Sequence, residues 1–298
     1  MLPSIEIRPE TDINDAAKTI GYPVLVKASA GGGGKGMRVV ESPDTLVAAV
    51  ESAQREAKNA FGDDKVFLEK WLESVKHVEV QIVGDKHGNI LHCFERECSI
   101  QRRHQKIIEE APSPAVDEKL RDALGKSAIE AAKTLNYFST GTVEFLLSER
   151  EFYFLEVNTR LQVEHPVTEE ILGIDLVREQ IRIAENKKLS FSQDDLQICG
   201  HAIEARVYAE DPQKNFLPSP GKIQTWAPSF SDNVRFDSGV EEGSFVSPEF
   251  DPMIAKVICH APTRTEAAKS LAKSLRNTKL YGIKNNKEFL ELTLLSKS

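Results

Sequence analysis

The distribution of apolar and polar residues divides the chain into short strands and amphipathic helices. Strand-like apolar runs occur at residues 22–27, 37–40, 66–68, 78–83 and 90–95. Apolar residues with helical spacing follow Ser42-Pro43, occupy 117–135 and 175–185, and resume near Thr263. We predict that Ser42 caps its helix and that Pro43 occupies the first helical position. The chain therefore mixes strands and helices.

A β-hairpin is predicted from Thr140 to Asn158. If this hairpin is centred on Arg150, Glu144 lies directly opposite Glu156. Because like charges in that position are destabilising, a cation is expected between them. Both carboxylates and the amide oxygen of Asn158 are hard ligands suited to Mg²⁺ or Mn²⁺. The alternative is a register shifted by one residue, or a solvated face.

The polar pattern continues beyond this hairpin. Every second residue is polar: Glu156, Asn158, Arg160, Gln162 and Glu164. If the backbone stays extended, all five side chains point to one side. Arg160 can then hold a planar anion through two donors, and Glu164 can act as a base on that anion. A simply solvated face is the alternative, but it does not explain why the residues between them are mostly apolar.

A glycine-rich segment lies between the first two strands. Gly31 to Gly36 fit the spacing G-x-G-x-x-G, but a strand follows where a dinucleotide-binding fold requires a helix. Met37 after Gly36 also excludes a Walker A loop. What remains is a loop flanked by Lys27 and containing Lys35, in which glycine N–H groups can approach a phosphate. The alternative is a mobile surface loop.

Composition narrows the class of protein. A chain of 298 residues is too long for one small hydrophobic core and suggests one large domain or two domains of ordinary size. A net charge of −8 argues against general binding to nucleic acid or membrane surfaces, and residues 101–106 form a local basic segment suited to an anion. Four cysteines without a C-x-x-C pair suggest a reducing compartment. A zinc site made of His92, Cys93, Cys98 and His104 is an alternative, but their spacing matches no standard zinc finger. No run of about 18 apolar residues predicts a membrane helix.

Five long segments resemble the biotin carboxylases. They are residues 27–37, 95–106, 154–168, 205–212 and 250–256. The resemblance spans nearly the whole chain and implies an α+β, ATP-grasp fold with a lid subdomain and an antiparallel-sheet subdomain, followed by the biotin carboxylase C-terminal subdomain. The implied division is residues 1–72 for the lid, 73–190 for the ATP-grasp core with the metal and bicarbonate site, and 191–298 for the C-terminal domain.

The resemblance also implies residue roles. ATP would be bound by a set of residues comprising Lys27, Gly32, Gly33, Gly34, Glu69, Lys70, Leu72, His77, Gln101 and His104, with Lys106 also at the phosphates. The metals would be held by Glu144, Glu156 and Asn158. Bicarbonate would be bound by Arg160, Gln162 and Val163, and deprotonated by Glu164. Arg206 would stabilise the biotin enolate.

The implied activity is carboxylation of biotin by ATP and bicarbonate through carboxyphosphate, with Mg²⁺ or Mn²⁺. The implied partners are a biotin carboxyl carrier domain and a carboxyltransferase subunit, with a homodimer through the C-terminal part. No nucleic-acid or membrane partner is expected, and the compartment would be the cytoplasm or mitochondrial matrix. The N-terminal domain of the family is not found in the sequence, so we expect a truncated chain. The alternatives are an inactive nucleotide-binding fragment and another ATP-grasp ligase of the carbamoyl-phosphate synthetase type.

Overall fold

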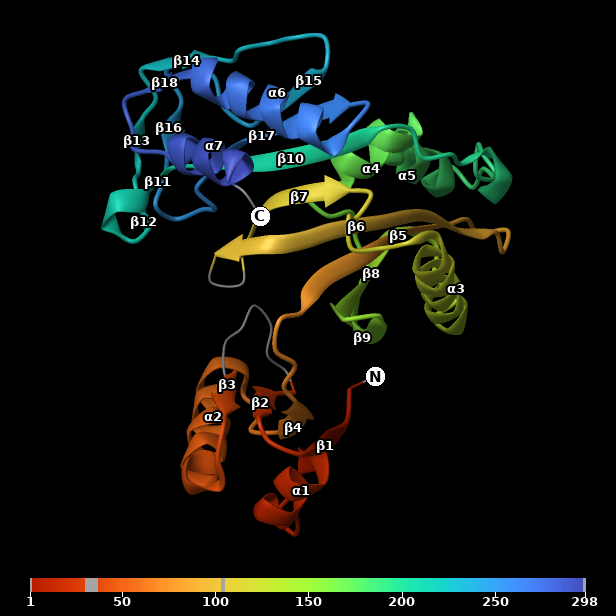
Figure 1. The fold of residues 1–298 in the computed structure, drawn as a ribbon, viewed down its shortest axis with the longest axis vertical. Helices are drawn as coiled ribbons and strands as arrows, with labels where there is room; N and C mark the ends of the chain where they lie inside the picture. Colours follow the sequence, from red (N-terminus) through yellow and green to blue (C-terminus); the bar gives the residue numbers. More distant parts are fainter. Residues whose placement is uncertain (1, 30–36, 103–104, 297–298) are drawn as a thin grey trace. The chain divides into compact units, whose positions relative to one another are not determined.

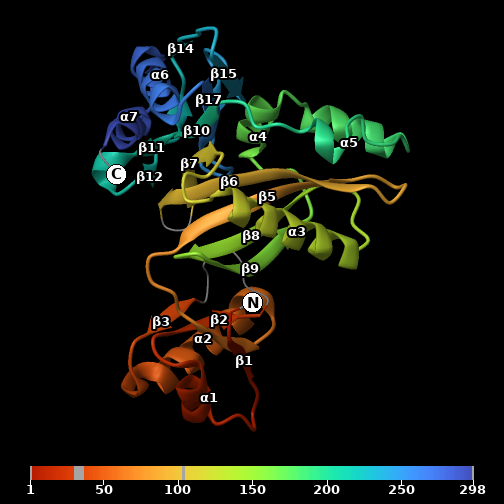
Figure 2. The same cartoon turned by 45° about the vertical axis from the view of Figure 1, so that its right-hand side comes forward.

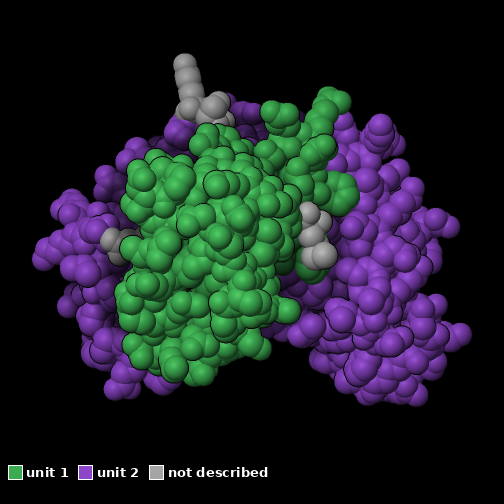
Figure 3. Space-filling view, turned by 90° about the horizontal axis from the view of Figure 1, so that it is seen from below, with its two compact units in different colours: residues 1–75, 103–105, 146–155 green, residues 76–102, 106–145, 156–298 purple. Residues whose placement is uncertain are grey.

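The computed structural model describes residues 2–29, 37–102 and 105–296. These residues divide into two compact units, which Figure 3 colours green and purple. Unit 1 contains residues 1–75, 103–105 and 146–155, and unit 2 contains residues 76–102, 106–145 and 156–298. The three-part division at residues 72 and 190 remains a prediction.

Unit 1 is built around a four-stranded antiparallel sheet in the order β1-β4-β2-β3. Its elements are β1 (Ser4–Ile7), α1 (Ile13–Ile20), β2 (Val24–Ala28), β3 (Arg38–Val40), η1 (Pro43–Thr45), α2 (Leu46–Phe61) and β4 (Val66–Lys70). Buried side chains of both helices, such as Ala17 and Leu46, join one apolar core with Val24, Val26 and Leu68. The sheet and its two helices therefore share a single core.

The α-helix that follows Ser42 begins later than predicted. Pro43–Thr45 forms a 3₁₀ turn, and the α-helix begins only at Leu46. Ser42 lies at the cap position of that turn, yet within the described residues its side chain makes no capping hydrogen bond. Proline fixed the start of the helical turn as expected, but the short i→i+3 turn displaced the α-helix by three residues.

Unit 2 contains most of an eight-stranded sheet in the order β15-β17-β10-β7-β6-β5-β8-β9. These strands are β5 (Lys76–Gly84), β6 (Ile90–Arg102), β7 (Gln105–Ala111), β8 (Ser139–Ser148), β9 (Glu151–Asn158), β10 (His201–Tyr208), β15 (Val234–Ser238) and β17 (Met253–Ala261). The β6 strand runs seven residues beyond the predicted end at residue 95. This extension places Gln101 and Arg102 of the basic segment on β6, and Gln105 and Lys106 begin β7.

Helices cover both faces of this sheet. They are α3 (Glu118–Thr134), α4 (His165–Leu172), α5 (Leu176–Ala184), α6 (Arg264–Asn277) and α7 (Lys287–Leu295). The views in Figures 1 and 2 place α3 on the side of β5 and β6 opposite to α4. On β10, even-numbered Ala202 packs with Val167 of α4, whereas odd-numbered Ile203 and Ala205 share a core with Leu271 of α6. Alternate residues of a strand thus face different helices.

Short elements complete unit 2. They are η2 (Gln193–Asp195), β11 (Glu210–Asp211), η3 (Pro212–Lys214), β12 (Leu217–Pro218), β13 (Gly221–Lys222), β14 (Thr225–Ala227), β16 (Phe245–Val246) and β18 (Lys279–Tyr281). The Thr263 side chain accepts from the Glu266 backbone N–H and so caps the start of α6. Across the part of the chain that the structure describes, no helix has both the length and the apolar character to cross a bilayer.

Candidate active site

A buried lysine on β7 organises a cluster of carboxylates in unit 2. Lys106 Nζ donates to Glu79 Oε2 at 2.5 Å, to Glu164 Oε1 at 2.7 Å and to Glu144 Oε1 at 3.0 Å. Glu79 lies on β5, Glu144 lies on β8, and Glu164 precedes α4. Strands distant in the sequence therefore bring three acidic groups to one ammonium group, which satisfies all three of its donors.

The cations keep two of these carboxylates ionised. Burial would raise the pKa of Glu79, but Lys106 and Arg96 outweigh burial and lower this pKa to about 2. Burial is likewise outweighed at Glu144, where His77 and Lys106 lower the pKa to about 2. Burial opposes the charge of Lys106, yet the surrounding acids raise its pKa above the ordinary value. In this network, Glu79 and Glu144 therefore stay ionised down to about pH 2 beside a protonated Lys106.

Glu144 is the most heavily contacted carboxylate of the network. Its Oε1 accepts from Gln162 Nε2 at 2.9 Å and from Asn158 Nδ2 at 3.1 Å, besides Lys106. Its Oε2 lies 2.8 Å from His77 Nε2. Asn158 Nδ2 also donates to Glu156 Oε1 at 3.2 Å. Glu144 and Glu156 therefore meet at one amide group.

The segment after the hairpin does not stay extended, and that expectation is corrected. Strand β9 ends at Asn158, and α4 begins at His165 with Pro166 in its first turn. The intervening turn leaves Arg160 exposed while burying Gln162 and Glu164. All five alternating residues nevertheless contact the network or each other, and exposed Arg160 does so by donating from Nη2 to Asn158 Oδ1 at 3.4 Å. Proline favours a helix start, and this helix ends the extended conformation before Glu164.

Arg206 on β10 contacts the opposite side of Glu164. Its NH2 donates to Glu164 Oε2 at 3.0 Å, and its Nε lies 2.6 Å from Glu109 Oε1. Lys256 on β17 donates from Nζ to the backbone oxygen of Val163 at 2.9 Å. Glu164 therefore lies between two cations, and the residue before it is anchored by a third.

Sequence reasoning missed Glu79 and gave no role to Arg96. Arg96 is fully buried on β6 and donates to Glu79 at 2.7 Å and to Gln81 at 2.6 Å. It also donates to Thr142 and Thr168. The signal was available: His77, Glu79 and Gln81 alternate with valines along β5. Polar residues at every second position of a buried strand indicate a polar face.

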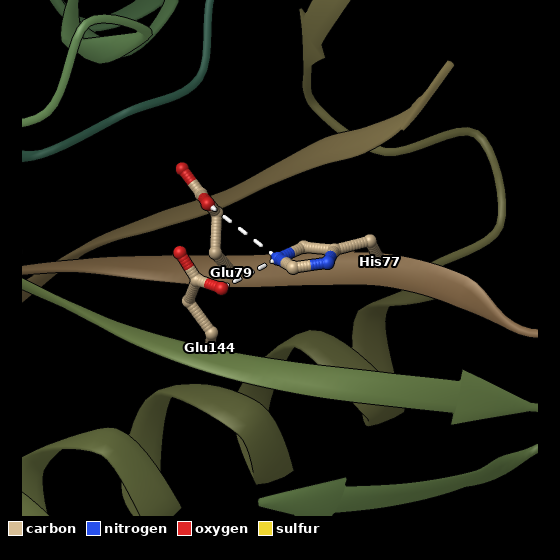
Figure 4. Close-up of side chains that lie close together, drawn as sticks. All are labelled: His77, Glu79 and Glu144. Atoms are coloured by element: carbon tan, nitrogen blue, oxygen red, sulfur yellow. Dashed lines mark ion pairs between the residues drawn. The ribbon is translucent and has the colours of Figure 1, made fainter. Parts of the chain in front are cut away.

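Among the residues that the structure describes, two groups of side chains lie close enough to share a metal ion. One is His77, Glu79 and Glu144, drawn in Figure 4, and the other is Glu79, Cys98 and Glu164. Lys106 already lies against the acids of both groups, so a dication there would meet a buried cation. Glu144 and Glu156, which meet at the amide of Asn158, fit a hard cation better. Glu156 is exposed, and no lysine side chain among the described residues contacts it.

Unit 1 contains four of the predicted nucleotide residues that the structure describes, namely Lys27, Glu69, Lys70 and Leu72. Lys27 Nζ donates to Glu69 Oε2 at 2.5 Å. Lys70 Nζ donates to the backbone oxygens of Gly21 at 2.9 Å and Tyr22 at 3.2 Å, and Leu72 is half-buried. In unit 2, the Gln101 side chain donates to the Cys98 backbone oxygen. Three predicted glycines, Gly32, Gly33 and Gly34, and also His104 lie outside the described residues.

Comparison with known proteins identifies the class. Residues 1–192 match the family described as carbamoyl-phosphate synthase L chain, ATP binding domain, and residues 204–298 match the biotin carboxylase C-terminal domain. Together with the sheet and the acidic network, the first match defines an ATP-grasp protein. The second match and the relatives below specify it further: the chain belongs to the biotin carboxylase family.

Two curated relatives illustrate this similarity. The chain is 53% identical over 279 residues to biotin carboxylase 2 of Bacillus subtilis, covering 92% of this chain and 63% of that protein. It is 50% identical over 282 residues to the mitochondrial methylcrotonoyl-CoA carboxylase subunit alpha of Rattus norvegicus, covering 93% and 39%. The chain thus spans less than two thirds of the length of either relative.

Solved structures support the fold. The biotin carboxylase domain dimer of Hydrogenobacter thermophilus 2-oxoglutarate carboxylase, in complex with MgADP, ADP and bicarbonate, superposes with a TM-score of 0.94. It is 42% identical, and the match covers 100% of this chain and 66% of that one. The Campylobacter jejuni biotin carboxylase matches with a TM-score of 0.91 and 46% identity, over 94% and 63% of the two chains. The predicted α+β ATP-grasp fold is confirmed.

Proposed function

We propose that this chain carboxylates biotin with ATP and bicarbonate through carboxyphosphate, as the first half-reaction of an acyl-CoA carboxylase. The supporting observation is that buried Glu164 accepts hydrogen bonds from Lys106 on one side and from Arg206 on the other. A carboxylate held between two cations is fixed in position and can receive a proton from an acid bound beside it. The cations on either side can neutralise a substrate anion.

Each residue of the site is assigned a separate role in the reaction. Glu164 takes the proton of bicarbonate, and a bicarbonate oxygen attacks the γ-phosphorus of ATP as ADP leaves. Lys106 stabilises charge on the transferring group, and Arg160 holds the planar bicarbonate together with Gln162 and Val163. Carboxyphosphate then divides into CO₂ and phosphate, and the phosphate takes the proton from N1′ of biotin. Arg206 stabilises the resulting enolate, and N1′ captures the CO₂.

The metal ligands are proposed to be Glu144, Glu156 and Asn158. Bound Mg²⁺ or Mn²⁺ would neutralise charge on the phosphates of ATP. The amide of Asn158 now directs Nδ2 toward both carboxylates, and a metal would require Oδ1 on that side. Rotation of one amide about its terminal bond achieves this, so the donor set fits a hard dication.

The remaining assignments are carried by the resemblance. We assign ATP contacts to Lys27, Glu69, Lys70, Leu72, His77 and Gln101, and also to the glycines 32–34 and His104. The expected partners are a biotin carrier domain and a carboxyltransferase, with dimerisation through the C-terminal part; the Hydrogenobacter structure is named as a domain dimer. The proposed compartment is the cytoplasm or the mitochondrial matrix, and the rat relative is named as mitochondrial.

The test is ADP release from Mg-ATP with and without bicarbonate and free biotin. We expect release that requires bicarbonate and rises with biotin. Glu164→Gln should lower this rate at least about 100-fold, because the amide keeps the shape of the carboxylate but accepts no proton. The matched control is Glu185→Gln, because the side chain of Glu185 is 51% exposed. Equal activity in Glu164→Gln and the unaltered chain would overturn the assignment of the base.

The same assay separates the alternatives. Another ATP-grasp ligase would release ADP without any response to biotin. An inactive fragment would bind ATP in a calorimeter but release no ADP under any of these conditions. The match of residues 204–298 to a biotin carboxylase domain, which includes Arg206, favours the biotin reaction.

A further inference from the structure

Two buried glutamates lie next to each other beneath the proposed site. Glu109 on β7 and Glu204 on β10 are direct partners in the antiparallel register. Directly opposite residues have their Cβ atoms about 5 Å apart, so the two carboxyl groups can reach each other. Both residues are 0% exposed. Among the described residues Glu109 Oε1 forms an ion pair with Arg206 Nε, whereas neither carboxyl oxygen of Glu204 has a hydrogen-bond partner. Nothing in the proposed reaction uses Glu204.

The cations around Glu109 and Glu204 are too few to stabilise both carboxyl groups in the ionised form. Arg206 contacts the pair, because its Nε lies 2.6 Å from Glu109 Oε1. The other charged groups that act on the pair are Glu79 of β5, Lys106 of β7, Glu164 before α4, and Lys256 of β17. Lys106 and Lys256 already contact other groups, namely the acidic cluster and Asp237. Two buried like charges facing each other are strongly unfavourable.

The protonation equilibria agree with this geometry. Burial, followed by the charge of Glu109, raises the pKa of Glu204 well above its ordinary value. Burial also raises the pKa of Glu109, to about 7, and Arg206 opposes that rise. Above about pH 7 the proton therefore resides on Glu204, and Glu109 is the anion beside Arg206.

We propose that Glu109 and Glu204 hold one proton between them and that this protonated pair positions Arg206. The hydroxyl of Glu204 donates to Glu109, and Glu109 holds the Nε edge of the guanidinium. The NH2 of Arg206 is then directed to Glu164, where biotin and bicarbonate would react. Glu204 and Glu109 are positioning residues, and their role in the reaction rests on the proposed function.

The proton can be detected without any activity. A carboxyl group that is protonated in the folded chain ionises on unfolding, so it stabilises the fold less as pH rises above its ordinary pKa. Replacing it by an amide removes this dependence. Between about pH 7 and 9, we expect the unfolding equilibrium constant of the unaltered chain, divided by that of Glu204→Gln, to rise about tenfold per pH unit. Urea titrations at several pH values measure this ratio.

The neighbouring Glu110→Gln is the matched control. Glu110 is also buried on β7, where burial is outweighed by His201 and Arg264, so its pKa is lowered. Glu110 is ionised in the folded and in the unfolded chain over this pH range. The unfolding equilibrium constant of the unaltered chain, divided by that of Glu110→Gln, should therefore be independent of pH. Glu204→Met provides a second variant without a titratable proton and should give the same slope as Glu204→Gln. A flat ratio for both Glu204 variants would overturn the proposal.

The positioning role has a separate readout. Glu204→Gln keeps a donor to Glu109, so it should lower kcat/KM for biotin less than Glu109→Gln does. Glu109→Gln removes the anion at Arg206 and should lower kcat/KM for biotin about tenfold with KM for ATP unchanged; Glu109→Asp should recover part of the loss. Equal effects on biotin and ATP would overturn this role. If the unaltered chain releases no ADP, the proposed function fails, whereas the unfolding titration still decides the proton.

Discussion

Lys106 and Glu164 are 58 residues apart in the sequence and meet at 2.7 Å in the structure. Their contact joins β7 to the turn before α4, and the same ammonium group holds Glu79 and Glu144. One side chain therefore compensates three buried acids from three other segments. The position of the proposed base depends directly on this lysine.

Replacing Lys106 by methionine should damage both stability and activity. The three acids would keep their burial but lose their shared cation, and breaking a buried ion pair costs about 3–5 kcal/mol. We expect a loss of that size in the free energy of unfolding, measured with urea, and no ADP release. Lys126→Met on the exposed face of α3 is the control and should change neither quantity. A loss below about 1 kcal/mol at Lys106 would show that water replaces the ammonium group.

Acid should destabilise the fold through Glu79 and Glu144. Burial opposes their ionisation, but Lys106, Arg96 and His77 lower the pKa of each to about 2, from 4.5. Their contribution to stability is complete above about pH 4.5 and is lost as pH falls toward 2. Urea titrations over this range should show a smaller loss for Glu144→Gln, which lacks one of the two groups.

The control for that titration is Glu130→Gln on α3. The side chain of Glu130 is 72% exposed, so water contacts it in the folded and in the unfolded chain. We expect the same loss of stability with acid as in the unaltered protein. An equal pH dependence in the Glu144→Gln chain would contradict the assignment.

Local patterns were sufficient to predict the acidic hairpin. Glu144, Glu156 and Asn158 were found because polar residues interrupt apolar strands at regular spacing. Whether Glu144 lies directly opposite Glu156 stays a prediction, although both accept from the same amide. The turn after Asn158 was missed, and Pro166 was the available signal that a helix begins there.

Non-local strand pairing accounts for what the sequence did not show. Glu109, Glu204 and Lys256 lie on β7, β10 and β17, whose order and register join residues about 50–100 positions apart. A change of one residue in register would turn Glu204 away from Glu109. Arg206 was identified by resemblance alone, since its neighbours in the sequence give no local sign of a site.

Lys256 should affect the use of bicarbonate. Its Nζ donates to the Val163 backbone oxygen at 2.9 Å and lies 3.4 Å from Asp237, so it anchors the turn that presents Glu164. Lys256→Met should raise KM for bicarbonate about tenfold and cost about 1–3 kcal/mol of stability through the unpaired carbonyl group. ADP release at varied bicarbonate measures the first effect, with exposed Lys273→Met of α6 as control. An unchanged KM would show that the turn holds its shape alone.

Glu156 should set the requirement for metal. It is exposed on β9 and meets Glu144 through the amide of Asn158, so a carboxylate ligand can be removed there without breaking the buried network. Glu156→Gln should raise the Mg²⁺ concentration for half-maximal ADP release about tenfold at fixed ATP while stability changes by less than about 0.5 kcal/mol. Glu151→Gln, at the exposed start of the same strand, should leave the Mg²⁺ requirement unchanged. If both variants show the same Mg²⁺ dependence, Glu156 is no ligand, and the metal must be held by Glu144 with other groups.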